Sequence, residues 1–179
     1  MKLLRASLLA LLLGSSSASA TSFYFGVRFD APIAWETIGQ TTNTLFIPMI
    51  GLQIGIDLAS PSSGTGIRLA LSTQVVSGAR FGGDIYVRSA LLPELNAYLG
   101  GGGTMMIETQ QRLLYFNVHL LAGLEYQVSP GIGLFVETSP GLALGLGPNA
   151  CIYPQIDTTG CGSLVPFTLE SAIGLNFRF

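Results

Sequence analysis

The charged residues that could do chemistry in this 179-residue sequence lie in segments where apolar and polar residues alternate. Seven of them share this placement: Arg28, Asp57, Arg68, Arg88, Glu125, Glu137 and Glu170. Buried charges without partners are costly, whereas arginines and carboxylates that share one interior neutralise each other. These residue types therefore predict an interior network of ion pairs and hydrogen bonds, provided that the fold turns all seven side chains to the same side.

His119 is the only histidine and is the first candidate for acid–base chemistry or for activating a nucleophile. The residue two positions later is Leu121, so a serine elsewhere, such as Ser139, would have to approach it. A single histidine on an interior face is more often a hydrogen-bonded core residue. We therefore predict no catalytic residue, and the sequence predicts no cofactor, metal site or phosphate-binding loop.

Cys151 and Cys161 are the only two cysteines. In an oxidising compartment, an isolated pair that closes a short segment is expected to form a disulfide, which here would staple a loop. A zinc site is the alternative, but two cysteines without a nearby histidine lack the ligands for it. The residues between them, including Ile152, Tyr153 and Pro154, are the predicted surface for contacting another molecule, although shielding or loop stability would explain the staple equally well.

The first twenty residues have the three-part pattern of a secretory signal peptide. Lys2 and Arg5 precede an apolar block at 8–13, and small residues end at Ala20. We expect residues 1–20 to be removed and residues 21–179 to form one domain. Removal takes two of the eight basic residues and leaves six against ten acidic ones, a net charge of −4 with no lysine. This balance argues against nucleic acid or an anionic lipid surface as a partner.

Strict alternation of apolar and polar residues predicts eight β-strands. The expected strands are 22–31, 50–58, 67–75, 84–91, 95–100, 116–127, 132–145 and 167–179. The fifth should dissolve into the glycine run Gly100 to Gly103, and Pro140 predicts a bulge or an early end of pairing in the seventh. No helical period is present in these segments.

The connections between these segments alternate in length. The longer ones are 32–45, 76–83, 104–111 and 147–165. The shorter ones are 59–65, 92–94 and 129–131. Short turns at one rim and longer loops at the other are typical of outer-membrane barrels.

The direction in which the apolar face points decides between two kinds of barrel. A soluble barrel turns its apolar face inward, whereas a membrane barrel turns it toward lipid. Hydrophobic residues make up 49% of the chain, yet after the first twenty residues no run approaches the 18 apolar residues of a membrane helix. The apolar face of the eight segments carries no charge, and the opposite face mixes glycine with ions. This pattern favours an apolar exterior around a narrow polar lumen.

The last segment alternates Ile173, Leu175, Phe177 and Phe179 with polar or small residues and ends on a phenylalanine. It resembles the C-terminal signature of bacterial outer-membrane β-barrel proteins. The whole of 21–179 resembles the small barrels typified by the outer-membrane protein A transmembrane domain and outer-membrane protein X. The resemblance implies an all-β, eight-stranded antiparallel up-and-down transmembrane β-barrel in the outer membrane. It also implies contact with outer-membrane lipid and recognition of the last segment by the barrel-assembly machinery.

In such a barrel the seven charged residues would face a narrow lumen. We expect Arg28, Arg88, Glu125 and Glu137 to lie at similar heights and the network to plug the barrel rather than conduct. The predicted function is a non-catalytic structural or surface-interaction role through extracellular loops, with an extracellular partner that the sequence does not identify. A small pore is one alternative. A lipid-modifying enzyme is the other alternative. Lipid A deacylase barrels resemble a His-x-Ser arrangement, whereas the residue two positions after His119 in this sequence is Leu121.

Overall fold

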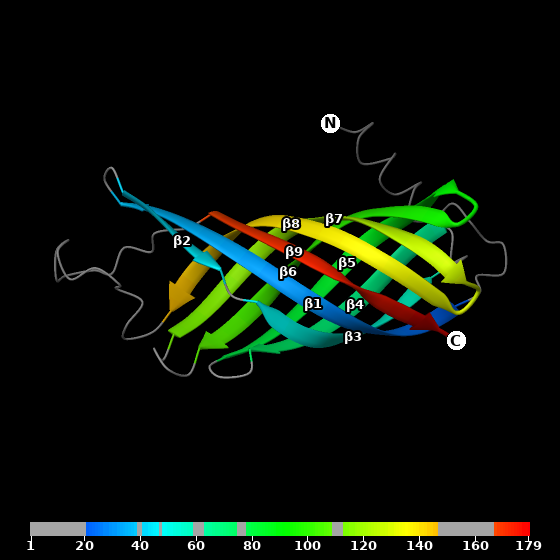
Figure 1. The fold of residues 1–179 in the computed structure, drawn as a ribbon, viewed down its shortest axis with the longest axis horizontal. Coiled ribbons are helices and arrows are strands. Elements are labelled where there is room, and N and C mark those ends of the chain that lie inside the picture. The colour runs from blue at the N-terminus through cyan, green and yellow to red at the C-terminus, as the bar shows by residue number, and fades with distance from the viewer. Residues whose placement is uncertain are drawn as a thin grey trace, which may run out of the picture.

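The computed structural model describes residues 21–38, 41–46, 48–58, 63–74, 78–108, 113–146 and 167–179. Their strands are β1 Thr21–Ile38, β2 Thr41–Phe46, β3 Met49–Leu58, β4 Ser63–Gln74, β5 Gly78–Leu92, β6 Leu95–Glu108, β7 Leu113–Ser129, β8 Ile132–Leu146 and β9 Phe167–Arg178. Figure 1 shows them wrapped into a barrel, with the C-terminus at one end and β2 at the other. Among the described residues, no helix is long and apolar enough to cross a membrane.

The sheet closes on itself because β1 pairs with β9 as well as with β3. β2 and β3 form one barrel strand, since both pair with β1 in a single register that places Phe46 opposite Ile33 and Met49 opposite Asp30. Pro48 lies between them and has no N–H to donate to the ladder. All neighbours are antiparallel and follow chain order. The prediction of a closed, eight-stranded, up-and-down antiparallel barrel is therefore confirmed.

Several strands are longer than the apolar alternation predicts. Three connections predicted as loops are mostly strand: 32–45, 76–83 and 104–111. The links that remain at these places have two to four residues, as few as those at the opposite end, whereas 147–166 separates β8 from β9. The prediction of longer loops at these three places is wrong. Backbone hydrogen bonds hold an antiparallel ladder, so a ladder can continue where the apolar pattern ends.

The glycine run in β6 is regular strand. Gly100 lies opposite Tyr86 and Gly103 opposite Gly83 on β5, and both also pair with β7. The prediction that this strand dissolves at Gly100 is wrong. β5 and β7 supply backbone hydrogen-bond partners on both sides of β6, and this pairing outweighs the low strand propensity of glycine.

Pro140 also stays within its strand. It pairs with Leu169 of β9, and on the other side the ladder to β7 lapses between His119–Gly141 and Ala122–Thr138 without a change of register. The predicted bulge or early end at Pro140 is therefore wrong. The missing N–H removes pairing locally, and β8 continues because β9 holds it from the other side.

The two faces of the barrel wall differ sharply. Outward side chains are apolar and exposed, as at Ile85 (62% exposed) and Leu120 (69%), whereas inward ones such as Arg28 (4%) and Glu125 (2%) are charged and buried. The predicted orientation, with an apolar exterior around a polar lumen, is confirmed. A soluble barrel with an apolar interior is excluded by the same burial pattern.

Four inward aromatic rings each lie over a glycine on the neighbouring strand. The pairs are Tyr24–Gly55, Tyr86–Gly66, Tyr98–Gly123 and Phe135–Gly174, each directly opposite in the ladder. A Cβ at any of these glycines would collide with the ring. Each glycine thus lets a large ring lie flat against the wall, which leaves the centre of the lumen to the charged side chains.

Candidate functional site: the charged lumen

The lumen collects charges of both signs. The described part of the chain contains five arginines, at 28, 68, 80, 88 and 178, and each of their side chains is at most 7% exposed. Six carboxylates face them: Asp30, Asp57, Asp84, Glu125, Glu137 and Glu170. Every one of these eleven groups takes part in an ion pair, so the charges are buried together rather than separately.

Four of these charges form a closed ring, which we call the charge ring: Asp57, Arg88, Glu125 and Arg178. Arg88 Nη1 lies 3.0 Å from Asp57 Oδ2, and Arg88 also bonds to Glu125. Arg178 Nη2 donates to both oxygens of Glu125, at 2.9 and 2.8 Å, and its other amino group bonds to Asp57. Signs alternate around the ring, so each group contacts two groups of opposite charge.

The charge ring takes one residue from every second strand of the barrel. Its members come from β3, β5, β7 and β9 in turn. Inward residues of alternate strands stack in layers in small barrels, because neighbouring strands are staggered. Tyr86 donates to Asp57 over 2.7 Å, and the Arg178 guanidinium lies 5.2 Å from the centre of the Tyr24 ring.

The other four strands supply a second layer around Glu137 of β8. Its oxygens accept from Arg28 of β1 at 2.8 Å, Arg68 of β4 at 2.6 Å and the Tyr98 hydroxyl of β6 at 2.9 Å. Glu137 is 4% exposed. One carboxylate thus holds two guanidinium groups, from β1 and β4, which have only β3 between them.

Further acids and one further arginine extend this layer. Arg68 also donates to Asp84 over 2.6 Å, and Arg28 donates to Asp30 over 2.7 Å. Arg80 lies 3.4 Å from Asp30 and also bonds to Glu170. Polar ion pairs therefore follow one another along the lumen from the charge ring to β9 residue Glu170.

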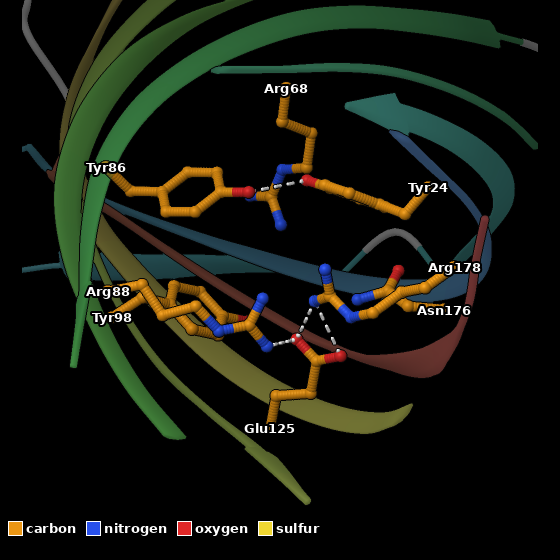
Figure 2. Close-up of a pocket in the computed structure, with 8 residues that line it drawn as sticks. All are labelled: Tyr24, Arg68, Tyr86, Arg88, Tyr98, Glu125, Asn176 and Arg178. Atoms are coloured by element: carbon orange, nitrogen blue, oxygen red, sulfur yellow. Dashed lines mark hydrogen bonds and ion pairs between the residues drawn. The ribbon is translucent and has the colours of Figure 1, made fainter. Parts of the chain in front are cut away.

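Little space is left between the two layers. The cavity there has a volume of about 10 Å³ and is lined by Tyr24, Arg68, Tyr86, Arg88, Tyr98, Glu125, Asn176 and Arg178. This is room for about one water molecule. Figure 2 shows Glu125 bridging Arg88 and Arg178 below this space, and Tyr86 and Tyr24 meeting above it.

All seven charged residues named from the sequence lie in ion pairs, but not in one layer. Arg88, Glu125 and Asp57 belong to the charge ring, Arg28, Arg68 and Glu137 to the second layer, and Glu170 lies beyond it with Arg80. The prediction that Arg28, Arg88, Glu125 and Glu137 lie at one height is wrong. Arg28 and Glu137 belong to one set of alternate strands and the other two to the second set.

Sequence reasoning missed four charged members of the network: Asp30, Arg80, Asp84 and Arg178. Arg80 was missed because 76–83 was predicted as a loop. The signal was present, since the outward series Phe81, Gly83 and Ile85 carries the alternation back to Arg80.

His119 lies in the lumen at 5% exposure, and its Nε2 is 2.7 Å from Asp84 Oδ1. Leu121 is a buried apolar residue on the same face, and Ser139 is 5% exposed on β8. Asp84 is at the same time held by Arg68. His119 therefore forms part of the packed polar interior.

Some buried polar atoms carry no hydrogen bond within the described residues. They are the Nε atoms of Arg80, Arg88 and Arg178, both side-chain amide atoms of Asn96, and Nδ1 of His119. Such groups are usually satisfied by ordered water. The lumen is thus tightly packed but still offers places for single water molecules.

Of the remaining predicted residues, only the C-terminal series is described by the structure. Cys151 and Cys161 fall outside the described residues, as does the predicted signal peptide at 1–20. In the last segment, Ile173, Leu175 and Phe179 are exposed on the outer face at 50%, 40% and 86%, and Phe177 is half-buried beside Phe25.

No protein-family model matches this sequence, and no curated protein matches it. Solved structures do match. Neisserial surface protein A is 12% identical with a TM-score of 0.53, covering 89% of this chain and 99% of its own. Ail, the attachment invasion locus protein of Yersinia pestis, solved with the heparin analogue sucrose octasulfate, is 8% identical with a TM-score of 0.54 over 89% and 99% of the chains. The chain therefore shares the fold of small eight-stranded outer-membrane barrels.

Proposed function

We propose that this chain is a membrane-spanning barrel of the bacterial outer membrane with a closed lumen, and that it acts through the rim that faces the cell exterior. The observation that carries the proposal is the contrast between the wall's two faces, which puts apolar side chains outside and interlocked ion pairs inside.

The dimensions of the apolar exterior fit a bilayer. Along β1 the outward apolar residues run from Phe23 to Ile33. Ten residues of strand at ~3.3 Å each, tilted by ~40° as in small barrels, rise roughly 25 Å along the barrel axis. The apolar band of outer-membrane barrels is about 25 Å tall. The strand ends beyond Ile33 would then project past the lipid.

The sequence ends support the outer membrane as the compartment. Residues 1–20 have the pattern of a signal peptide, and Ile173, Leu175, Phe177 and Phe179 have the pattern that resembles the assembly signal of outer-membrane barrels. On the structure this last series lies on the outer face of β9. The exposure of Ile173, Leu175 and Phe179 supports the proposal that this face contacts outer-membrane lipid and is recognised by the assembly machinery.

The packed lumen supports a non-conducting barrel over a small pore. The charge ring and the second layer fill the cross-section, and the cavity between them has room for about one water molecule. A steady aqueous channel would require these ion pairs to separate. Leaving a buried charge without its partner costs about 3–5 kcal/mol.

The lumen also supports a non-catalytic role. His119 is buried behind the barrel wall and engaged by Asp84, so a lipid acyl chain on the outer face does not reach it. The rim at the end of β8 and the start of β9 is the part left for recognition, and the segment 147–166, with its predicted Cys151–Cys161 disulfide, connects these two strands in the sequence. We propose this segment as the contact surface.

The positions of the arginines indicate which charge a partner of the rim would carry. The Yersinia protein was solved with a sulfated heparin analogue, which is a polyanion. Here the five described arginines all point into the lumen, Arg112 falls outside the described residues, and Lys2 is the only lysine of the sequence. Polyanions are held mainly by clustered positive charge. We therefore propose a partner that is not a polyanion.

Two measurements test the proposed function. Purified full-length protein refolded into a planar bilayer should give no steady conductance, and stable channels would instead establish the small pore. An epitope inserted within 147–166 should be reached by antibody on intact bacteria, whereas the same epitope at 130–131 should not. Equal labelling at both places, or at neither, would overturn the proposed orientation.

A further inference from the structure

β9 is the one strand whose pairing is not fixed by a short link. Six of the eight strand junctions in the barrel are joined by two to four residues, for example 93–94 and 130–131. Short links determine which residues face each other across a junction. By contrast, residues 147–166 separate β8 from β9, and the β9–β1 junction joins opposite ends of the barrel sequence. Side chains must therefore set the register of β9.

The outward side chains of β9 cannot do this. Leu175 lies beside Val27 of β1, and Phe177 lies beside Phe25. A shift of β9 by two residues would again place apolar side chains against apolar side chains on the outer face, since the side-chain period of a strand is two. The outer face therefore does not distinguish the correct register from a shifted one.

The inward side chain of Arg178 does distinguish them. It completes the charge ring by contacting Asp57 and Glu125, the latter at 2.8 Å. A two-residue shift moves this guanidinium by roughly 7 Å along the barrel wall. Both acids would then face Arg88 alone, and Arg178 would lose its buried partners.

Gly174 adds a steric criterion in the same strand. It lies opposite Phe135 of β8, and a Cβ at this place would approach the Phe135 ring to 2.6 Å. A two-residue shift would bring Ala172 or Asn176 to this position. The ring would have to move, although it is 1% exposed and tightly surrounded.

We propose that Arg178 and Gly174 determine the register of β9 and thereby the closure of the barrel. The last strand then carries two kinds of information on opposite faces. The outward residues form an apolar surface that is compatible with a shifted register. The inward residues select one register of β9 against β8 and β1.

Disulfide trapping tests this proposal directly. In the full-length chain with Cys151 and Cys161 replaced by serine, Phe25→Cys with Phe177→Cys reports the observed register, and Phe25→Cys with Leu175→Cys or Phe179→Cys reports shifts in either direction. Directly opposite residues lie close enough for a disulfide, whereas residues two further along do not. Without other changes, the Phe25–Phe177 pair should be the main cross-link, with only a trace of either shifted pair.

Arg178→Met should raise the yield of a shifted cross-link about tenfold in the folded fraction, because the charge no longer selects the register. Gly174→Ala should act in the same direction. Arg178→Lys, which keeps one positive charge but cannot reach both acids, serves if the methionine variant does not fold, and should give a smaller rise.

Arg88→Met is the matched control. It removes the other arginine of the same charge ring, but from β5, whose links are short, so it should destabilise the barrel without any shifted cross-link. The proposal is overturned if folded Arg178→Met and Arg178→Lys give only the observed cross-link. It is equally overturned if Arg88→Met raises the shifted yield as much as Arg178→Met does.

Discussion

The inner and outer faces of the same strands obey different rules. On the outer face, residues such as Leu52 and Ile54 contact similar apolar neighbours on every side. On the inner face, Gln53, between them, donates to Asn176 and accepts from Arg28. Outer residues are therefore interchangeable within a chemical class, whereas each inner residue has specific partners. Four tests, ordered from the largest expected effect to the smallest, examine this contrast.

Glu137→Leu should have the largest effect, because it leaves Arg28, Arg68 and the Tyr98 hydroxyl without their shared acceptor. We expect a loss of about 3–5 kcal/mol in the free energy of unfolding, measured by urea titration of the refolded protein in lipid vesicles. The control is the outward neighbour, Val136→Leu, which should change stability by less than about 0.5 kcal/mol. Similar losses for the two variants would contradict the contrast between the faces.

Leu52→Arg places an arginine, the residue type that is buried in ion pairs in the lumen, on the outer face. A charge placed against lipid near the middle of the apolar band should cost about 2–4 kcal/mol in vesicles. Leu52→Ile should be nearly neutral in the same titration. If the arginine variant unfolds at the same urea concentration as the unchanged protein, this part of the wall does not face hydrocarbon.

Gly66→Ala should cost about 1–3 kcal/mol, because the added methyl group meets the Tyr86 ring and forces it off the wall. Gly131→Ala is the matched control, since its Cβ would meet only the Arg178 carbonyl oxygen at 3.6 Å, an ordinary contact. Thermal unfolding followed by circular dichroism compares the two. Equal melting temperatures would show that the ring does not need its glycine.

The smallest effect concerns coupling within the charge ring. Arg88→Met and Glu125→Gln each leave the ring with one unbalanced charge, whereas the double variant restores neutrality. We expect the double variant to be more stable than the sum of the single losses by about 0.5–3 kcal/mol. Strict additivity in the urea titrations would mean that the two side chains act independently, despite their direct bond.

The sequence predicted the fold from period-two alternation, because the inside and outside of a barrel strand differ in polarity at every step. It predicted the strand ends poorly, as at Ile38 and Glu108, since the ladder continues on backbone hydrogen bonds where the apolar pattern has stopped. The segment from Ile67 to Leu71 was predicted correctly, because its outward and inward residues alternate strictly.

The lumen partners were harder to predict than the lumen residues. Alternation shows that Arg28 and Arg88 face inward, but the layer in which each lies depends on strand stagger, which a sequence does not display. Grouping inward residues by alternate strands separates Asp57, Arg88, Glu125 and Arg178 from Arg28, Arg68 and Glu137. Tyr86 and Tyr98 could have been placed by looking for the glycine opposite each ring.

The inward placement of the arginines has a consequence for proteolysis. Trypsin cleaves after lysine and arginine, and Lys2 is the only lysine in the sequence. Within the described residues, every peptide bond that trypsin recognises follows an arginine whose side chain is enclosed in the barrel. Trypsin therefore cannot reach the described arginines while the barrel is folded. Unfolding of the barrel exposes these five cleavage sites together.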